Sequence, residues 1–252
     1  MTIGLSPETA FVFMLVFARL GSMISAMPAL GEAVISARVR LATALLVTLV
    51  MLPVVADNYG AIPSSLSGLA FAVLGEIVVG LVIGVSARML TAALQVAGTV
   101  IAFQTGLAFA QNVDPTQGVQ SALVASFLSM LAATMVFTAD LHHLLFAAMR
   151  DSYLMFKPGE MLPVGDFAQM MTGIVGGAFK VGLQLAAPFV VFGLIFNLGQ
   201  GVLSRLMPQV QIFFVAMPAN IYLGFVLLML LLSPIMMWYL DHFSTGIKEF
   251  IR

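Results

Sequence analysis

The chain has 252 residues, of which 61% are hydrophobic and only 8% are charged, and its mean hydropathy is +1.09. Soluble domains carry about 25% charged residues, so this composition predicts a protein surrounded by lipid or by other protein chains. Ten basic and eleven acidic residues leave a net charge of −1, which argues against nucleic-acid binding. The sequence has no cysteine, which excludes disulfides, thiolate metal sites and cysteine nucleophiles.

The first apolar run, Thr9–Leu30, is predicted to be a membrane helix and not a signal peptide, because residues 1–18 contain neither Lys nor Arg. A helix of about 22 residues is about 33 Å long, which matches a hydrocarbon core about 30 Å thick. The second run is marginal in length, and the later ones are long enough to span. The six further runs are Leu41–Ala56, Leu66–Ala87, Met89–Ala110, Val119–Ala139, Phe167–Phe196 and Val210–Leu240.

The last two runs are longer than one span and contain Pro188, Pro218 and Pro234, which favour kinks or helical hairpins. The longest polar connection, Asp140–Asp166, is too short to fold around a core of its own. The predicted fold class is therefore an all-α integral membrane protein. It is expected to form a single membrane domain over residues 1–252, with packed helical hairpins and six to seven apolar segments.

Charges in the short connections predict an orientation for the first half of the chain. Arg38, Arg40 and Arg88 make two connections basic, whereas Asp57 and Asp114 lie in connections without a basic residue. Basic connections tend to face the cytoplasm, so the N-terminus is predicted to lie on the opposite side. The alternation breaks down in the second half, because Asp140–Asp166 carries both signs and Arg205 lies where strict alternation predicts the outside.

Three charged residues lie inside the apolar runs: Arg19, Glu76 and Lys180. Each would cost roughly 2.5–3.5 kcal/mol at the centre of a bilayer, so they are expected to face protein, water or each other. A proton or ion path and a buried contact between helices or subunits both fit this pattern. A proton relay usually needs several carboxylates or histidines, and the single carboxylate Glu76 favours the structural contact. One hypothesis is that Arg19 pairs with Glu76.

The motif DLHHLL contains Asp140, His142 and His143. Adjacent residues on a helix point about 100° apart, so the two histidines cannot chelate a metal without a third ligand from elsewhere, and none is evident nearby. The sequence also lacks a hydrolase elbow, a P-loop, a zincin helix and a dinucleotide fingerprint. We therefore expect no metal site, no cofactor and no enzyme activity.

Glycines four residues apart let membrane helices approach closely, because lipid supplies no hydrophobic drive for their association. Gly80 and Gly84 form one such pair, and Gly173 and Gly177 form another. Both pairs are predicted to mark helix packing. The 18 methionines are compatible with an adaptable passage and with ordinary apolar packing.

An uncharged polar segment, FQTGLAFAQNVDP, interrupts the apolar chain from Phe103 to Pro115. Its amide and hydroxyl groups can satisfy non-helical backbone, which is tolerated at membrane depth where it lines a cavity. Gly106 permits a bend there. The alternative is an ordinary helix end followed by a turn. With the glycines, the segment favours a structural or channel-forming subunit of a complex over a secondary transporter, the other class that the sequence allows.

Three stretches of the chain resemble the flagellar biosynthetic protein FliR family, which includes the T subunit of virulence-associated type III secretion. They are Pro28–Val55, Phe103–Leu131 and Phe196–Gly224. The third stretch is the most specific, through LSRLMPQVQIF and the MP that follows. Its motif residues are Arg205, Pro208, Gln209 and Pro218. The VDP in the second stretch resembles the flagellar branch more than the virulence branch.

The resemblance implies a structural, channel-forming subunit of the flagellar type III export gate in the bacterial inner membrane, at the flagellar basal body. The implied partners are FliP-like and FliQ-like subunits, the A- and B-type export subunits, and unfolded export substrates in transit. Residues from 1 to about 150 are implied to resemble a P subunit, and about 151–252 a Q subunit. A virulence-type export gate is the alternative, and a secondary transporter is the less favoured one.

The resemblance also implies that the polar segment is a plug loop that closes the channel. Phe103, Leu107 and Phe109 would then fill the lumen as apolar stoppers. The residues implied to form the plug are Phe103, Gln104, Thr105, Gly106, Leu107, Ala108, Phe109, Ala110, Gln111, Asn112, Asp114 and Pro115.

Overall fold

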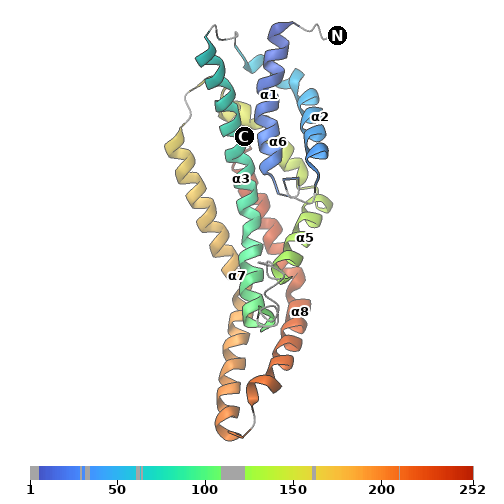
Figure 1. Ribbon diagram of the computed structural model, residues 1–252, viewed down its shortest axis with the longest axis vertical. Helices are drawn as coiled ribbons and strands as arrows, with labels where there is room; N and C mark the ends of the chain where they lie inside the picture. The colour runs from blue at the N-terminus through green and yellow to red at the C-terminus, as the bar shows by residue number, and fades with distance from the viewer. Residues whose placement is uncertain are drawn as a thin grey trace. The chain divides into compact units, whose positions relative to one another are not determined.

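The computed structural model describes residues 6–28, 30–31, 35–60, 63, 65–108, 123–160, 163–209 and 211–251, and every regular element in these ranges is helical. The predicted all-α fold is thus confirmed. The elements in chain order are α1 (Pro7–Ala26), α2 (Ala37–Val55), a 3-10 turn η1 (Ala56–Asn58), α3 (Leu66–Gln104), α5 (Leu123–Thr138), α6 (His142–Met155), α7 (Val164–Leu206) and α8 (Ile212–Lys248) (Figure 1).

Capping serines explain where the first two helices begin. The Oγ of Ser6 accepts a hydrogen bond of 3.1 Å from the backbone N–H of Thr9, and Pro7 takes the first helical position of α1. Ser36 caps α2 in the same way and accepts from the N–H of Val39 at 3.4 Å. These hydroxyls satisfy N–H groups that have no partner inside the helix.

Three helices are much longer than one bilayer crossing requires: α3 has 39 residues, α7 has 43 and α8 has 37. At about 1.5 Å per residue they are about 55–65 Å long, whereas the hydrocarbon core is about 30 Å thick. Helix α7 continues through Pro188, and α8 continues through Pro218 and Pro234. The predicted alternative of a helical hairpin within either run is therefore wrong.

The sequence interpretation of residues 66–110 also needs a correction. Arg88 is predicted to lie in a connection between two spans, but α3 runs through it without a break. Arginine has a high helix propensity, and the Arg88 side chain is exposed on the outside of the helix, so it does not interrupt the helix. The prediction for the orientation of the N-terminus is therefore supported by one basic connection, which contains Arg38 and Arg40, and no longer by two.

Among the described residues, five helices are long and apolar enough to cross a membrane, and α5 and α6 add a sixth candidate span if they are counted together. These last two helices meet at a bend of 75°. The predicted six to seven apolar segments thus become five to six candidate spans. The number falls because Leu66–Ala87 and most of Met89–Ala110 form the single helix α3.

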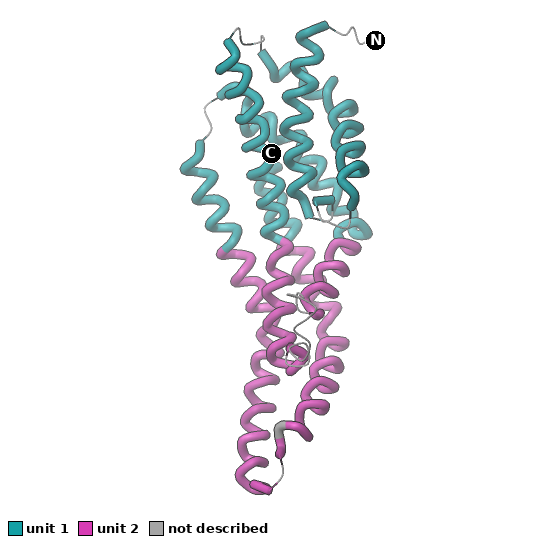
Figure 2. The backbone as a smooth tube through the Cα atoms, in the orientation of Figure 1, with its two compact units in different colours: residues 1–90, 136–175, 243–252 teal, residues 91–135, 176–242 magenta. Residues whose placement is uncertain are grey.

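The chain divides into two compact units (Figure 2). The first unit comprises residues 1–90, 136–175 and 243–252, and in it α1 packs against α2. Its core combines side chains from α1, the first part of α3, α6 and the C-terminal end of α8. Buried members of this core are Val16, Leu20, Ile83, Met149 and Phe243.

The second unit comprises residues 91–135 and 176–242, and its core combines the remaining parts of α3, α5, α7 and α8. Buried members are Leu94, Ile101, Leu128, Phe189 and Tyr239. Each of the three long helices contributes to both units, so the units do not follow the predicted boundary near residue 150. The predicted boundary separates a P-subunit-like half from a Q-subunit-like half, which is a different division from that into compact units. It stays a prediction.

Candidate functional site

The polar segment predicted to be a plug begins where α3 ends. Phe103 and Gln104 are the last two residues of this helix, and Gly106 follows with a φ angle of 76°. This left-handed conformation is typical of a glycine just beyond a helix C-terminus, so the predicted bend at Gly106 is confirmed. Residues 109–115 lie outside the described part of the chain, and the assignment of the whole segment as a plug stays a prediction.

Residues of α7 and α8 hold the end of α3 in place. The Nδ2 of Asn220 donates a hydrogen bond of 3.3 Å to the backbone carbonyl of Gln104, one of the last carbonyls of the helix. Gly224 leaves room for the buried side chain of Thr105, whose Cγ2 would collide with any Cβ at that position. Gly193 accommodates the side chain of Gln104 in the same way. The predicted plug segment therefore starts from an anchored helix end.

The side chains at this helix end differ in exposure. Thr105 is fully buried, and its hydroxyl donates to the carbonyl of Ile101 at 2.9 Å within its own helix. The hydroxyl of Thr105 thus satisfies a backbone carbonyl of α3, and the assignment of Thr105 to the plug stays a prediction. Phe103 is 61% exposed, and Leu107 and Ala108 are half-buried. Phe103 is thus an apolar side chain that this unit does not cover.

Sequence reasoning missed the anchoring residues Asn220, Gly193 and Gly224. A signal for one of them was present, because Asn220 is the one amide side chain in the apolar sequence of α8. A buried or half-buried amide needs a hydrogen-bond partner, which predicts a contact with another helix. The partner itself, a backbone carbonyl 116 residues earlier, could not be read from the sequence.

The predicted pair of Arg19 and Glu76 is present at the centre of the first unit. The guanidinium contacts both carboxylate oxygens: Nε donates to Oε2, and Nη2 donates to Oε1 at 3.1 Å. The exposed fractions of the two side chains are 1% and 3%. Arg19 also donates to the carbonyl of Ser152 at 3.1 Å and to that of Phe156 at 3.0 Å, at the end of α6. One side chain thus connects α1, α3 and α6.

Two tyrosines complete the environment of this ion pair. The hydroxyl of Tyr59 donates to Oε2 of Glu76 at 3.2 Å, and the guanidinium carbon of Arg19 lies 4.2 Å from the centre of the Tyr153 ring. Burial raises the pKa of Tyr59 well above its usual value, so its hydroxyl stays protonated and available as a donor. With these partners, the buried charges have the paired and hydrogen-bonded surroundings that a low-dielectric site requires.

Lys180 does not join this cluster. It belongs to the second unit, whereas Arg19 and Glu76 belong to the first, and its side chain is exposed on the single chain. The three charges predicted from the apolar runs therefore separate into a buried pair and an exposed cation. This arrangement supports the structural reading of the pair, since the described residues supply no continuous relay of carboxylates or histidines to it.

The two glycine pairs have different surroundings. A Cβ at Gly80 would collide with the backbone carbonyl of Arg19, and one at Gly84 would lie 2.5 Å from the carbonyl of Met23. The predicted close packing at this pair is confirmed, with α1 as the neighbour. By contrast, a Cβ at Gly173 or Gly177 would meet nothing within 4 Å. No described residue of this chain packs against this second pair, and its predicted role in helix packing stays a prediction.

The residues of the most specific sequence motif lie around the connection between α7 and α8. Arg205 is in the last turn of α7, Pro208 and Gln209 lie in the turn that follows, and Pro218 lies inside α8. All four side chains are exposed. Their role is thus not explained by packing within the described part of the chain.

Together, the long apolar helices, the buried ion pair and the anchored end of α3 define an all-helical membrane protein that leaves large apolar surfaces uncovered. Large hydrophobic side chains remain exposed along α7 from Val164 to Leu206. Residues 10–246 match the family described as bacterial export proteins, family 1. The chain belongs to this family.

Relatives of known name agree with this assignment. A flagellar biosynthetic protein FliR of Caulobacter vibrioides is 46% identical over 233 residues, which cover 92% of this chain and 93% of the relative. A flagellar biosynthetic protein FliR of Pectobacterium carotovorum is 32% identical, with coverages of 93% and 89%. The surface presentation of antigens protein SpaR of Salmonella typhimurium is 26% identical, with coverages of 87% and 82%.

Proposed function

We propose that the protein is a structural, channel-forming subunit of the flagellar type III export gate, which passes unfolded export substrates across the inner membrane. The observation that carries this proposal is the family match over residues 10–246. Within the family, identity is 46% to a flagellar relative and 26% to SpaR, which favours flagellar over virulence export. The role is structural, so the energy for export comes from partner proteins or from the membrane potential.

The lengths of the helices support membership in a larger complex. Helix α7 has 43 residues and is about 64 Å long, whereas a bilayer with its headgroups is about 40–45 Å thick. Exposed hydrophobic side chains extend over its whole length, so lipid alone cannot cover them. Partner chains that cover the remainder are therefore expected. FliP-like and FliQ-like subunits are the proposed partners, with the A- and B-type export subunits nearby and the flagellar basal body as the location.

The uncovered glycines identify one face for such a partner. Gly173 and Gly177 lie one turn apart on α7 and have open space where a Cβ would be. Val175 and Phe179 of the same helix are exposed beside them. Small residues let a second membrane helix approach closely, so we propose that this part of α7 packs against another gate subunit. We also propose that the first half of the chain resembles a P subunit and the second half a Q subunit.

Export in the native host tests the proposed function. Removing the gene is expected to abolish secretion of flagellar filament subunits, measured as the amount of filament protein in the medium, and re-expression is expected to restore it. A periplasmic protein that uses the general secretion route provides the control and should reach the periplasm in all strains. Continued secretion of filament subunits without the chain would show that it is not part of the gate.

A further inference from the structure

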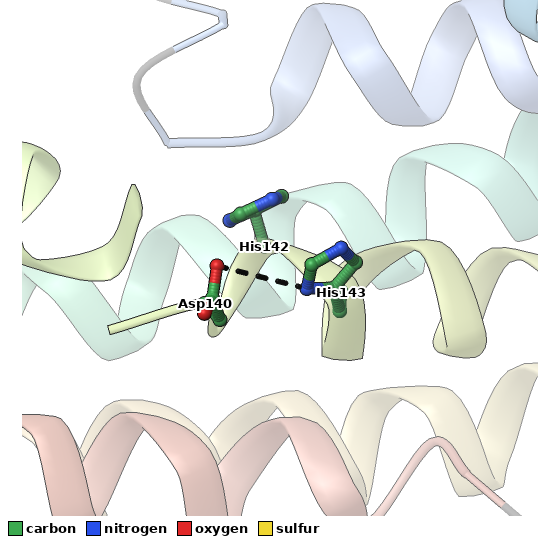
Figure 3. A group of neighbouring side chains, drawn as sticks. All are labelled: Asp140, His142 and His143. Carbon is green, nitrogen blue, oxygen red and sulfur yellow. Dashed lines mark ion pairs between the residues drawn. The ribbon is translucent and has the colours of Figure 1, made fainter. Parts of the chain in front are cut away.

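The connection between α5 and α6 brings together three side chains that can bind a metal ion. Asp140 precedes α6, and His142 and His143 are the first two residues of that helix. One ligand atom from each residue lies within 4.8 Å of the other two. Figure 3 shows the carboxylate of Asp140 beside both imidazole rings, with its Oδ1 atom 3.9 Å from Nδ1 of His143. Asp140, which the DLHHLL motif already contains, thus offers the third ligand, and the expectation that none lies nearby is wrong.

The backbone explains how Asp140 reaches the histidines. Its φ angle is 57°, and it is the one non-glycine residue with positive φ in the described part of the chain. This residue lies at the 75° bend between α5 and α6, and its carboxylate lies beside His143 in the first turn of α6. Leu141 at the N-cap position makes no side-chain capping hydrogen bond, and the carboxylate is the group that faces His143. Aspartate is one of the few residues besides glycine that adopt this left-handed conformation regularly.

The donor set and its geometry fit a late first-row divalent cation. Zinc binds imidazole nitrogen at about 2.0–2.1 Å and carboxylate oxygen at about 2.0–2.2 Å, so two ligands in its usual tetrahedral site are about 3.4 Å apart. The distance of 3.9 Å between Oδ1 of Asp140 and Nδ1 of His143 is about 0.5 Å longer than this separation. Both side chains are more than two-thirds exposed, so small rotations can bring all three ligands to the ion. The Nδ1 of His142 is buried and has no hydrogen-bond partner among the described residues.

We propose that Asp140, His142 and His143 form a binding site for a divalent ion of the zinc class, with further positions open to water or to a partner's side chain. Two imidazoles and one carboxylate favour zinc, nickel or copper over magnesium and calcium, which prefer oxygen ligands. The negative charge of Asp140 offsets the unfavourable interaction of a cation with the N-terminal end of α6. A bound ion would stabilise the bent connection that leads from α5 into α6.

Calorimetric titration of the full chain with zinc chloride tests the site, using protein purified in detergent through a tag without histidine. One zinc ion per chain is expected. The variants Asp140→Asn, His142→Gln and His143→Gln should each weaken binding by at least about tenfold, because altering even the hydrogen-bond partners of metal ligands lowers affinity by about 10–100-fold. His242→Gln is the matched control, because it removes the third histidine of the chain from a different helix, and its affinity should equal that of the unaltered protein.

Two further measurements distinguish the loss of the metal site from a loss of folded structure. Circular dichroism should show equal helix content in all variants, since the altered side chains are at the surface or half-buried. Cobalt should give visible d–d absorption with the unaltered protein and not with His143→Gln. Absence of saturable zinc binding would overturn the proposal. Binding that Asp140→Asn and His143→Gln leave unchanged, or that His242→Gln removes, would overturn it as well.

Discussion

Deleting Gly106–Ala110 is expected to leave the gate assembled but to open a leak for ions and small solutes through its closed state. The anchor formed by Asn220 and Gly224 acts on Gln104 and Thr105, which the deletion retains, so packing of the α3 end should persist. The deletion removes Leu107 and the bend at Gly106, and with them the proposed apolar closure of the channel. Efflux of potassium and of a small dye from cells or vesicles measures the leak.

A variant of unchanged length shows whether the leak comes from the loss of the apolar side chains or from the shortening of the chain. Changing both Leu107 and Phe109 to serine keeps every backbone position and removes only the apolar side chains. This double variant should leak as the deletion does, with a smaller amplitude. An unchanged membrane barrier in an assembled deletion complex would contradict the plug assignment, whereas loss of assembly would show that the segment has a structural role instead.

Replacing Arg19 with methionine is expected to destabilise the first unit by about 3–5 kcal/mol, the usual cost of leaving one partner of a buried ion pair uncompensated. The change leaves the carboxylate of Glu76 without its arginine partner and removes the donors to the carbonyls of Ser152 and Phe156. Denaturant unfolding in detergent measures the loss. Because such a cost is a large share of a protein's total stability, the amount of protein in the membrane should fall as well.

A double-mutant cycle identifies the part of this loss that belongs to the pair. Glu76→Gln should also destabilise the unit, and the Arg19→Met, Glu76→Gln double variant should be more stable than the two separate losses predict. Lys180→Met is the matched control, since it removes an exposed charge from an apolar run and should change stability by no more than about 0.5 kcal/mol. A Glu76→Gln protein that assembles and exports normally would show that the pair does not matter.

Much of the fold could be predicted because its determinants are local. Apolar run lengths predicted the helices, and the spacing of Gly80 and Gly84 predicted close packing that the structure confirms against α1. The pairing of Arg19 with Glu76 could be predicted because a buried cation in an apolar chain requires an anion, and few anions were available.

The predictions that are wrong or stay untested concern features that sequence spacing does not determine. A single arginine such as Arg88 breaks a hydropathy pattern but not a helix, since the helix needs only backbone hydrogen bonds. Gly173 and Gly177 have the same spacing as the packed pair, yet the neighbour that would use them is not part of the described chain. Asp140 reaches His143 through a left-handed backbone angle, which the regular geometry of a helix does not predict.

Co-purification through this chain in mild detergent tests the central claim, that the protein is a subunit of a multi-chain export gate. FliP-like and FliQ-like chains should be present in fixed ratios by mass spectrometry of the intact complex. Gly177→Leu should reduce their amount without lowering the stability of the isolated chain, because the position is uncovered there. A chain that purifies alone, or only with copies of itself, under conditions that preserve a known export gate would contradict the account.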